Sequence, residues 1–210
     1  DLGLTPPQLL HRHDHPVPDQ GGIVLGADSN LESVEVKDSL AVDSSDDIAS
    51  DAIKPDGASW SDLEYGTPAQ FGASGLTIFT APGGNGALQN VIVENNSDFS
   101  RNDFAGIHVY AADEIENLTI SGSPTNQNGY GQLVRGVSGV NNITVKDSPG
   151  SNNSVQTNSN TYGNGLTVVS VKDRLTGADI SGGTYSSNGQ DGVLLDTDVQ
   201  SSGVDIAHDM

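Results

Sequence analysis

Short hydrophobic runs recur at a nearly constant spacing in the second half of the chain. In one type, apolar residues alternate with polar ones, as in NVIV, NLTI, NITV, ADI and VDI. These runs end at Val93, Ile120, Val145, Ile180 and Ile206, spaced by 27, 25, 35 and 26. The second type, which starts with glycine, comprises GIHVY, GQLVR, GLTVVS and GVLLD, spaced by 25, 34 and 27. Both types stretch between Val145 and Gly165, so a single insertion there explains both long spacings.

Two short strands per repeat, joined by clusters of Asn, Gly, Ser and Asp, predict an all-β solenoid. In a parallel β-helix each repeat forms one coil, stacked about 4.8 Å above the coil before it. We therefore predict a parallel β-helix of about five coils from near Leu76 to Met210, within a domain of residues 71–210.

The alternation within each run assigns side chains to the inside or the outside of the predicted coils. Gln132 falls at an inward position and is the one polar residue that fits this scheme poorly. The outward positions form two neighbouring columns, which are His108, Leu133, Thr167 and Leu194, and Tyr110, Arg135, Val169 and Asp196. The insertion, residues 148–164, is expected to protrude as a lobe beside this outward face, because a solenoid accepts extra residues at its corners.

Residues 1–70 share no period with the rest of the chain. The segment TPPQLLHRHDHPVPDQGG is proline-rich, LESVEVKDSLAV alternates well enough for a strand, and DSSDDIASDAIKPDGAS is an acidic connector. We interpret residues 1–70 as an extended attachment and trimerisation region.

Composition narrows the class of partner. Asp and Glu total 28 against 8 Lys and Arg, which gives a formal net charge of −20, so binding to nucleic acid or to an anionic membrane is disfavoured. The chain contains no run of 18 apolar residues, which is the pattern that would predict membrane insertion, and it has no cysteine. Asp outnumbers Glu 22 to 6, a bias typical of proteins from salt-accumulating halophiles. An ordinary acidic secreted β-protein is the alternative.

The repeat pattern of residues 76–210 resembles the right-handed, single-stranded parallel β-helices of the pectate-lyase-like superfamily, which includes polysaccharide lyases, polygalacturonases, alginate epimerases and viral tailspikes. The N-terminal HRHDH followed by proline and glycine turns and then a solenoid resembles viral tail fibres and tailspikes. This resemblance implies a homotrimer on a virion, in an extracellular and high-salt setting. Its N-terminal region would attach to other tail or baseplate proteins and its β-helix would bind host glycan.

Three histidines alternate near the N-terminus, at His11, His13 and His15. In an extended strand their imidazoles lie on one side, and the resemblance to trimeric tail fibres implies that such rings hold iron or zinc on a three-fold axis. The alternative is a set of solvated histidines in an N-terminal arm, where Pro16 and Pro18 would disturb a regular strand.

Asp196 and Asp198 follow a predicted strand and are two residues apart, so both carboxylates can point the same way. Glycoside hydrolysis uses such a pair, and DTDVQSSGVDI weakly resembles the Asn-Thr-Asp coil of polygalacturonases. The other polygalacturonase motifs and the Asp-Pro-His-Glu signature of alginate epimerases are absent. Turn-forming carboxylates are the alternative.

Tyr110, Arg135 and His108 are the outward residues best suited to bind sugar. An aromatic ring covers the apolar face of a pyranose, and a guanidinium binds a carboxylate or sulfate. A local ion pair of Arg135 with one of the many acids is the alternative. Tyr162 and the amides of Asn152 and Asn153 offer further polar groups in the predicted lobe.

Four Asn-x-Ser/Thr sequons begin at Asn95, Asn117, Asn142 and Asn152. At 117 and 142 the coil pattern itself favours Asn-apolar-Thr, which leaves Asn152 as the best glycosylation candidate.

Three functions fit the sequence. The first is a trimeric tail fibre or tailspike that binds host glycan or S-layer glycoprotein. The second is a polysaccharide lyase, hydrolase or epimerase, and the third is a surface adhesin or structural solenoid of a halophile.

Overall fold

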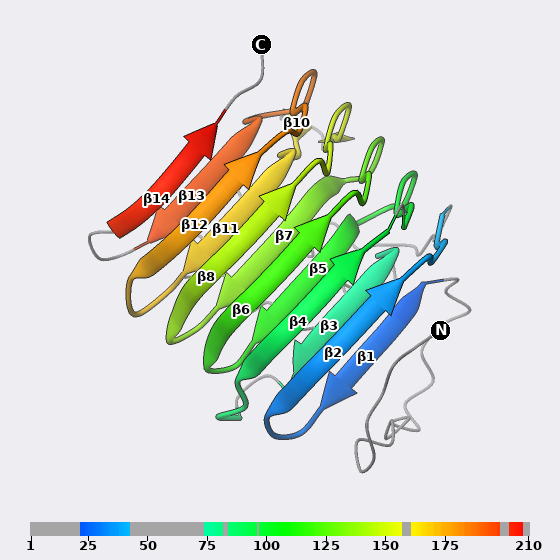
Figure 1. The fold of residues 1–210 in the computed structure, drawn as a ribbon. Coiled ribbons are helices and arrows are strands. Elements are labelled where there is room, and N and C mark those ends of the chain that lie inside the picture. The colour runs from blue at the N-terminus through cyan, green and yellow to red at the C-terminus, as the bar shows by residue number, and fades with distance from the viewer. Residues whose placement is uncertain are drawn as a thin grey trace.

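The computed structural model describes residues 22–42, 74–81, 84–95, 97–156, 161–197 and 202–207. Successive strands alternate between two six-stranded sheets, and every neighbouring pair within these sheets is parallel (Figure 1). Sheet A contains β1 (Ile23–Ala27), β3 (Leu76–Thr80), β5 (Ala105–Ala111), β7 (Tyr130–Gly136), β11 (Leu166–Ser170) and β13 (Val193–Thr197). Sheet B contains β2 (Leu31–Lys37), β4 (Leu88–Glu94), β6 (Glu114–Ser121), β8 (Gly139–Lys146), β12 (Leu175–Ser181) and β14 (Ser202–Ala207).

The core lies between the two sheets. Ile120, Val145 and Ile180 form one vertical file in register, and none is more than 2% exposed, as the alternation predicted. We call one sheet-A strand together with the sheet-B strand that follows it a level. Burying a side chain of this size contributes about 1.5–3 kcal/mol, so each level adds its own contribution to one continuous core. An all-β fold of parallel strands in two sheets is thus confirmed. Among the described residues no helix is present that could cross a membrane.

Gln132, the predicted misfit, does point inward. It pairs in register with Ile107 and Leu166 and is fully buried. Its Nε2 donates to the Ser148 carbonyl oxygen at 2.9 Å and to Thr125 Oγ1 at 3.3 Å, so the amide nitrogen is satisfied inside the coil.

The first level of the fold differs from the prediction. β1 and β2 were assigned to an attachment region ending near residue 70, whereas they pair in parallel with β3 and β4. Leu31, Val34 and Val36 are buried in the common core. Within the described residues the sheets therefore begin at Ile23, one level before the five predicted coils, because the alternating apolar residues of LESVEVK stack on β4. Residues 1–21 and 43–70 lie outside the described residues.

The asparagine of the repeated sheet-B motif has a backbone role. Asn90, Asn117 and Asn142 adopt positive φ values of 54°, 58° and 55° in the middle of their strands. The register between β4 and β6 pairs Gln89 with Glu116 and Val91 with Leu118, and it leaves the asparagine between them out of the pairing. Asparagine tolerates the left-handed region better than most residues, which explains why it recurs there.

A buried asparagine ladder fixes the corner that leads into sheet A. Backbone N–H groups of one level donate to side-chain oxygens of the next, from Asn102 to Asn128 Oδ1 at 2.7 Å, from Asn128 to Asn153 Oδ1 at 2.8 Å and from Asn153 to Asn188 Oδ1 at 2.9 Å. Because buried N–H groups need partners, the ladder satisfies the backbone of a corner that forms no regular sheet.

A column of glycines packs against this ladder at the start of the sheet-A strands. A Cβ on Gly106 or Gly131 would lie 2.8 Å or 2.9 Å from an amide nitrogen of the ladder. A glycine at the start of β5 and of β7 is thus required by close approach.

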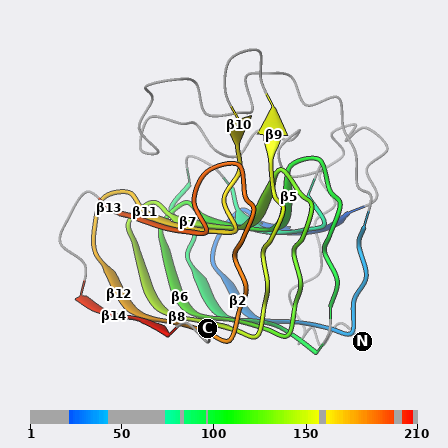
Figure 2. The same ribbon diagram turned by 90° about the horizontal axis from the view of Figure 1, so that it is seen from above.

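The insertion in the repeat forms a small antiparallel hairpin. β9 (Val155–Gln156) pairs with β10 (Thr161–Tyr162), and Figure 2 shows both strands standing away from sheet A on its outer side. The regular coil continues through Asn153, since Asn152 and Asn153 bond to the level that follows. The excursion is therefore shorter than the predicted lobe of residues 148–164.

Candidate functional site

The two outward columns of sheet A have the predicted register. Thr77, His108, Leu133, Thr167 and Leu194 follow one another in the first column, and Phe79, Tyr110, Arg135, Val169 and Asp196 in the second. The alternation therefore placed every residue of this face on the correct side of its strand.

This face is not open to solvent, however. His108 is 0% exposed, Tyr110 4% and Arg135 5%, so the predicted sugar platform is wrong as an accessible surface. The physical reason is that apolar side chains share the same side of sheet A. They form a second hydrophobic cluster, the outer cluster, of Phe104, Ala105, Tyr110, Ala112, Tyr130, Leu133, Val169 and Val171.

The aromatic side chains of the outer cluster contact one another and His108. The ring of Phe104 lies edge-on to His108 with centroids 5.4 Å apart, and to Tyr130 with centroids 5.7 Å apart. The Arg135 guanidinium carbon lies 5.7 Å from the centroid of the Tyr110 ring, close enough for a cation–π interaction. Tyr110 and Arg135 thus lie together, as predicted, but as packing partners.

Burial changes the acid–base properties of this cluster. Desolvation, with the nearby Arg135 charge as a smaller cause, lowers the pKa of His108 from 6.5 to about 3. Desolvation also raises the pKa of Tyr110, an effect that Arg135 partly opposes. His108 is therefore a neutral imidazole at physiological pH, and its pKa is far from the range that suits a general base.

Acidification is expected to destabilise the fold through His108. Between pH 6.5 and about 3 the unfolded chain binds a proton that the folded chain does not, so stability falls as the pH falls through this window. The full shift corresponds to about 3–5 kcal/mol. Replacing His108 by leucine, which the same column already accepts at positions 133 and 194, should make urea midpoints less sensitive to pH over this range. Equal pH slopes for both proteins would contradict the assignment.

Of the other three predicted ligand-binding residues, one is buried, one lies in the regular coil and one lies in the hairpin. Asn153 is fully buried in the asparagine ladder, so its assignment to a binding lobe is wrong. Asn152 is exposed at the corner with a positive φ of 58°, in the regular coil before the hairpin. Tyr162 lies in β10 of the hairpin, as expected for the insertion.

Of the predicted catalytic and metal-binding residues, Asp196 alone lies within the described part of the chain. Asp196 is half-buried at the end of the second sheet-A column, in register with Val169. Asp198, His11, His13 and His15 lie outside the described residues. Within the described residues no group of three or more His, Asp or Glu side chains could hold a metal ion.

The accessible polar surface is on the other sheet. Outward residues of sheet B form hydrogen-bonded rows that run across the levels, and we call this surface the polar face. Its central residues are Gln89, Asn90, Glu116, Asn117, Asn141, Asn142, Thr144 and Thr176. The sequence analysis gave these positions no binding role, although their amides and carboxylates recur at the same two places in β4, β6 and β8.

Two rows of contacts order the polar face. In one row Gln89 Nε2 donates to Glu116 Oε2 at 3.1 Å, and on later levels Thr176 Oγ1 donates to Asn141 Oδ1. In the other row Asn117 Nδ2 donates to Asn90 Oδ1 at 3.0 Å and Asn142 Nδ2 donates to Asn117 Oδ1 at 3.1 Å. These side chains are therefore held in place before any ligand binds.

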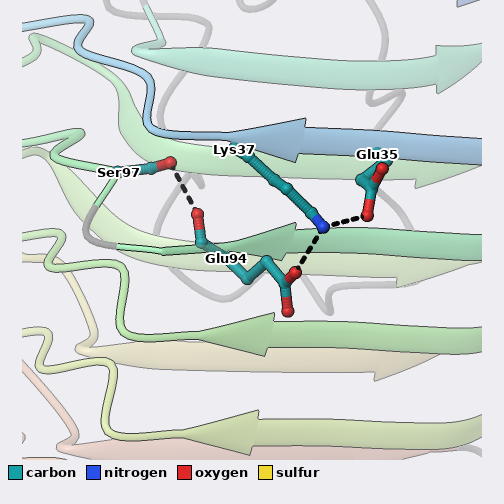
Figure 3. A network of polar contacts seen from close by, with 4 residues as sticks. All are labelled: Glu35, Lys37, Glu94 and Ser97. Carbon is teal, nitrogen blue, oxygen red and sulfur yellow. Dashed lines mark hydrogen bonds and ion pairs between the residues drawn. The ribbon is translucent and has the colours of Figure 1, made fainter. Parts of the chain in front are cut away.

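An ion-pair cluster marks the N-terminal end of the same surface. Figure 3 shows Lys37 between two carboxylates, with Nζ 2.5 Å from Glu35 Oε1 and 2.9 Å from Glu94 Oε1. The hydrogen bonds to Glu35 and Glu94 raise the pKa of Lys37, so its charge is fixed at every physiological pH. Ser97 Oγ donates to the Glu94 carbonyl oxygen at 3.0 Å and anchors the turn after β4.

Comparison with family models, curated proteins and solved structures finds no match to this chain. The case for function therefore depends on the geometry alone.

Proposed function

We propose that the two sheets form a right-handed, single-stranded parallel β-helix of the pectate-lyase-like type. The strict alternation of strands between sheets, the positive-φ corners and the asparagine ladder support this assignment. Fold alone does not determine activity, so the functional proposal depends on the surfaces that the fold exposes.

The function that these surfaces support best is recognition of a host cell-surface glycan by a virion protein of the tail-fibre or tailspike type. The observation that carries this proposal is the polar face of sheet B. Sugar hydroxyls both donate and accept hydrogen bonds, and the polar face offers amide, carboxylate and hydroxyl groups that meet both needs. Their fixed positions reduce the entropy lost on binding.

Assembly supplies the remaining affinity in this proposal. A homotrimer would present three identical faces, and linked weak sites give an avidity well above that of one site. Residues preceding the sheets would attach the trimer to other tail or baseplate proteins. The net charge of −20 suits a virion in a high-salt environment, where dissolved ions screen the repulsion between subunits. A trimeric mass for the intact protein in molar salt is required, and a monomer would remove the support for a fibre.

Binding to purified host surface polysaccharide tests the role of the polar face. Replacing both Gln89 and Asn141 by alanine should weaken binding by about tenfold or more, because each lost hydrogen bond costs about 0.5–1.5 kcal/mol. Isothermal titration calorimetry measures this change. The matched control is Lys172→Ala, which removes an exposed side chain at a turn outside the polar face and should bind normally.

An enzymatic result would replace this proposal. Release of reducing ends or unsaturated products from the polysaccharide, abolished by Asp196→Asn, would indicate a lyase or hydrolase instead. Unchanged binding by the Gln89 and Asn141 double variant would exclude the polar face as the glycan site.

A further inference from the structure

The four Asn-x-Ser/Thr sequons, equivalent in the sequence, differ sharply in the folded chain. N-linked glycosylation needs an accessible acceptor amide and a hydroxyl two residues later that is also accessible. The acceptors Asn95, Asn117, Asn142 and Asn152 are all exposed and all have positive φ, so exposure of the asparagine alone does not separate them.

Two of the acceptor amides are already committed to hydrogen bonds. Asn117 Nδ2 donates to Asn90 Oδ1 at 3.0 Å, and Asn142 Nδ2 donates to Asn117 Oδ1 at 3.1 Å. A transferase would have to break the polar face to reach either nitrogen. Their recurrence is explained by the positive-φ position of the sheet-B strands and needs no modification to account for it.

The sequon at Asn95 lacks the second requirement, because the hydroxyl of Ser97 is not accessible. Ser97 is fully buried, its Oγ donates to the Glu94 carbonyl oxygen at 3.0 Å and accepts from the Ser39 backbone N–H at 3.1 Å. Exposing this hydroxyl would require opening the turn after β4 and its contact with the first level.

The sequon at Asn152 meets both requirements. Asn152 and Ser154 are exposed, while Asn153 between them points inward to the asparagine ladder. Among the described residues no hydrogen bond engages the side chain of either Asn152 or Ser154. Asn152 shares its backbone conformation with Arg101, Gln127 and Ser187 at the equivalent corner of other levels, so the ladder keeps this corner fixed whatever the exposed side chain carries.

We propose that Asn152 is an N-linked glycan acceptor and that the other three sequons remain unmodified in the folded protein. The donor is an oligosaccharide linked to a polyprenyl diphosphate, and the catalyst is an oligosaccharyltransferase. The Asn152 Nδ2 atom bonds to the anomeric carbon of the first sugar as the bond from that carbon to the diphosphate oxygen breaks. The amide proton passes to a base of the transferase, and the lipid diphosphate is released. This site is independent of the polar face and of the glycan-recognition function.

Site occupancy after transfer to the purified, folded chain tests the proposal. The chain is incubated with membranes that contain an oligosaccharyltransferase and its lipid-linked oligosaccharide, and peptides are mapped by mass spectrometry. Occupancy at Asn152 should exceed that at each other sequon by about tenfold or more, because those sites require local opening. A urea-denatured and diluted sample, in which all four sequons are accessible, should lose this preference.

Variants separate the sequon from a general effect on the fold. Asn152→Gln and Ser154→Ala should each abolish the modification, and Ser154→Ala does so with the acceptor still present. Asn117→Gln should leave the modification of Asn152 unchanged. Occupancy of Asn117 or Asn142 equal to that of Asn152 in the folded chain would overturn the proposal. So would a folded chain left unmodified at Asn152 while the denatured chain is modified.

Discussion

Replacing Gly131 by alanine should lower the free energy of unfolding by about 3 kcal/mol or more, because overpacking at this site pushes against backbone. The new Cβ would lie 2.1 Å from the Gly165 carbonyl oxygen. That oxygen accepts the Gln132 N–H at 3.0 Å, and the Gly131 N–H itself donates to the Asn164 carbonyl oxygen at 2.9 Å. Relief of the clash therefore requires two levels to separate. Urea denaturation followed by far-ultraviolet circular dichroism measures the loss.

Gly139 provides the matched control for this substitution. It opens β8, its φ is not positive, and the nearest atom to an added Cβ is Glu114 Oε1 at 3.8 Å, an ordinary contact. Gly139→Ala should change the free energy of unfolding by less than about 1 kcal/mol, with a stabilising contribution from the less flexible unfolded chain. Similar losses for both variants would show that the glycine column does not limit how closely the levels stack.

Replacing Asn153 by alanine should cost about 2–4 kcal/mol, since it combines an unsatisfied buried donor with a small cavity. The Asn128 N–H loses its acceptor at 2.8 Å, and Asn188 Oδ1 loses the Asn153 Nδ2 donor at 3.1 Å. Urea midpoints, measured in molar salt so that charge repulsion is screened, report the change.

Ser154 is the neighbouring control for the ladder. It is exposed, and Ser154→Ala should alter the midpoint by no more than the roughly 0.5 kcal/mol typical of surface positions. A stable Asn153→Ala variant would mean that the corner can satisfy the Asn128 N–H in another way, and the ladder would then not be what fixes the corner.

The sequence specified the levels of the fold because two periodicities coincide in it. Alternation every second residue determines which side chains face the core, and the repeat near 25 residues determines which strands stack. Both periodicities agree with the structure at Ile120, Val145 and Ile180, which pair in register in adjacent strands. The same rule placed Gln132 inside, although its polarity argued otherwise.

The first level escaped detection because its spacing breaks the repeat. Val36 pairs with Val93, 57 residues later, about twice the ordinary period. The positive-φ position of β2 also holds Ser33 where later strands have asparagine, so the recurring motif is not visible there. Strand pairing across so long an excursion is a tertiary property, and no local pattern encodes it.

The burial of the predicted binding face had a signal in the sequence. The outward columns contain Leu133, Val169 and Leu194 beside His108 and Arg135, and apolar side chains in adjacent outward positions indicate a second packed layer. The alternation correctly predicted the side of sheet A to which these side chains point, but this does not determine whether they are exposed to solvent. The polar face has no local signal in the sequence, because its hydrogen bonds link residues about 25 to 35 positions apart.

The hairpin β9–β10 leaves and re-enters at a corner whose flanking levels bond directly to each other, through Gly131 N–H to the Asn164 carbonyl oxygen at 2.9 Å and Ser154 N–H to the Asn128 carbonyl oxygen at 2.8 Å. The contacts that hold the neighbouring levels together therefore do not depend on the hairpin. Such a corner can gain, lose or exchange sequence over evolutionary time while the scaffold beneath it is conserved in shape, and it is the natural place to graft a foreign peptide onto this protein.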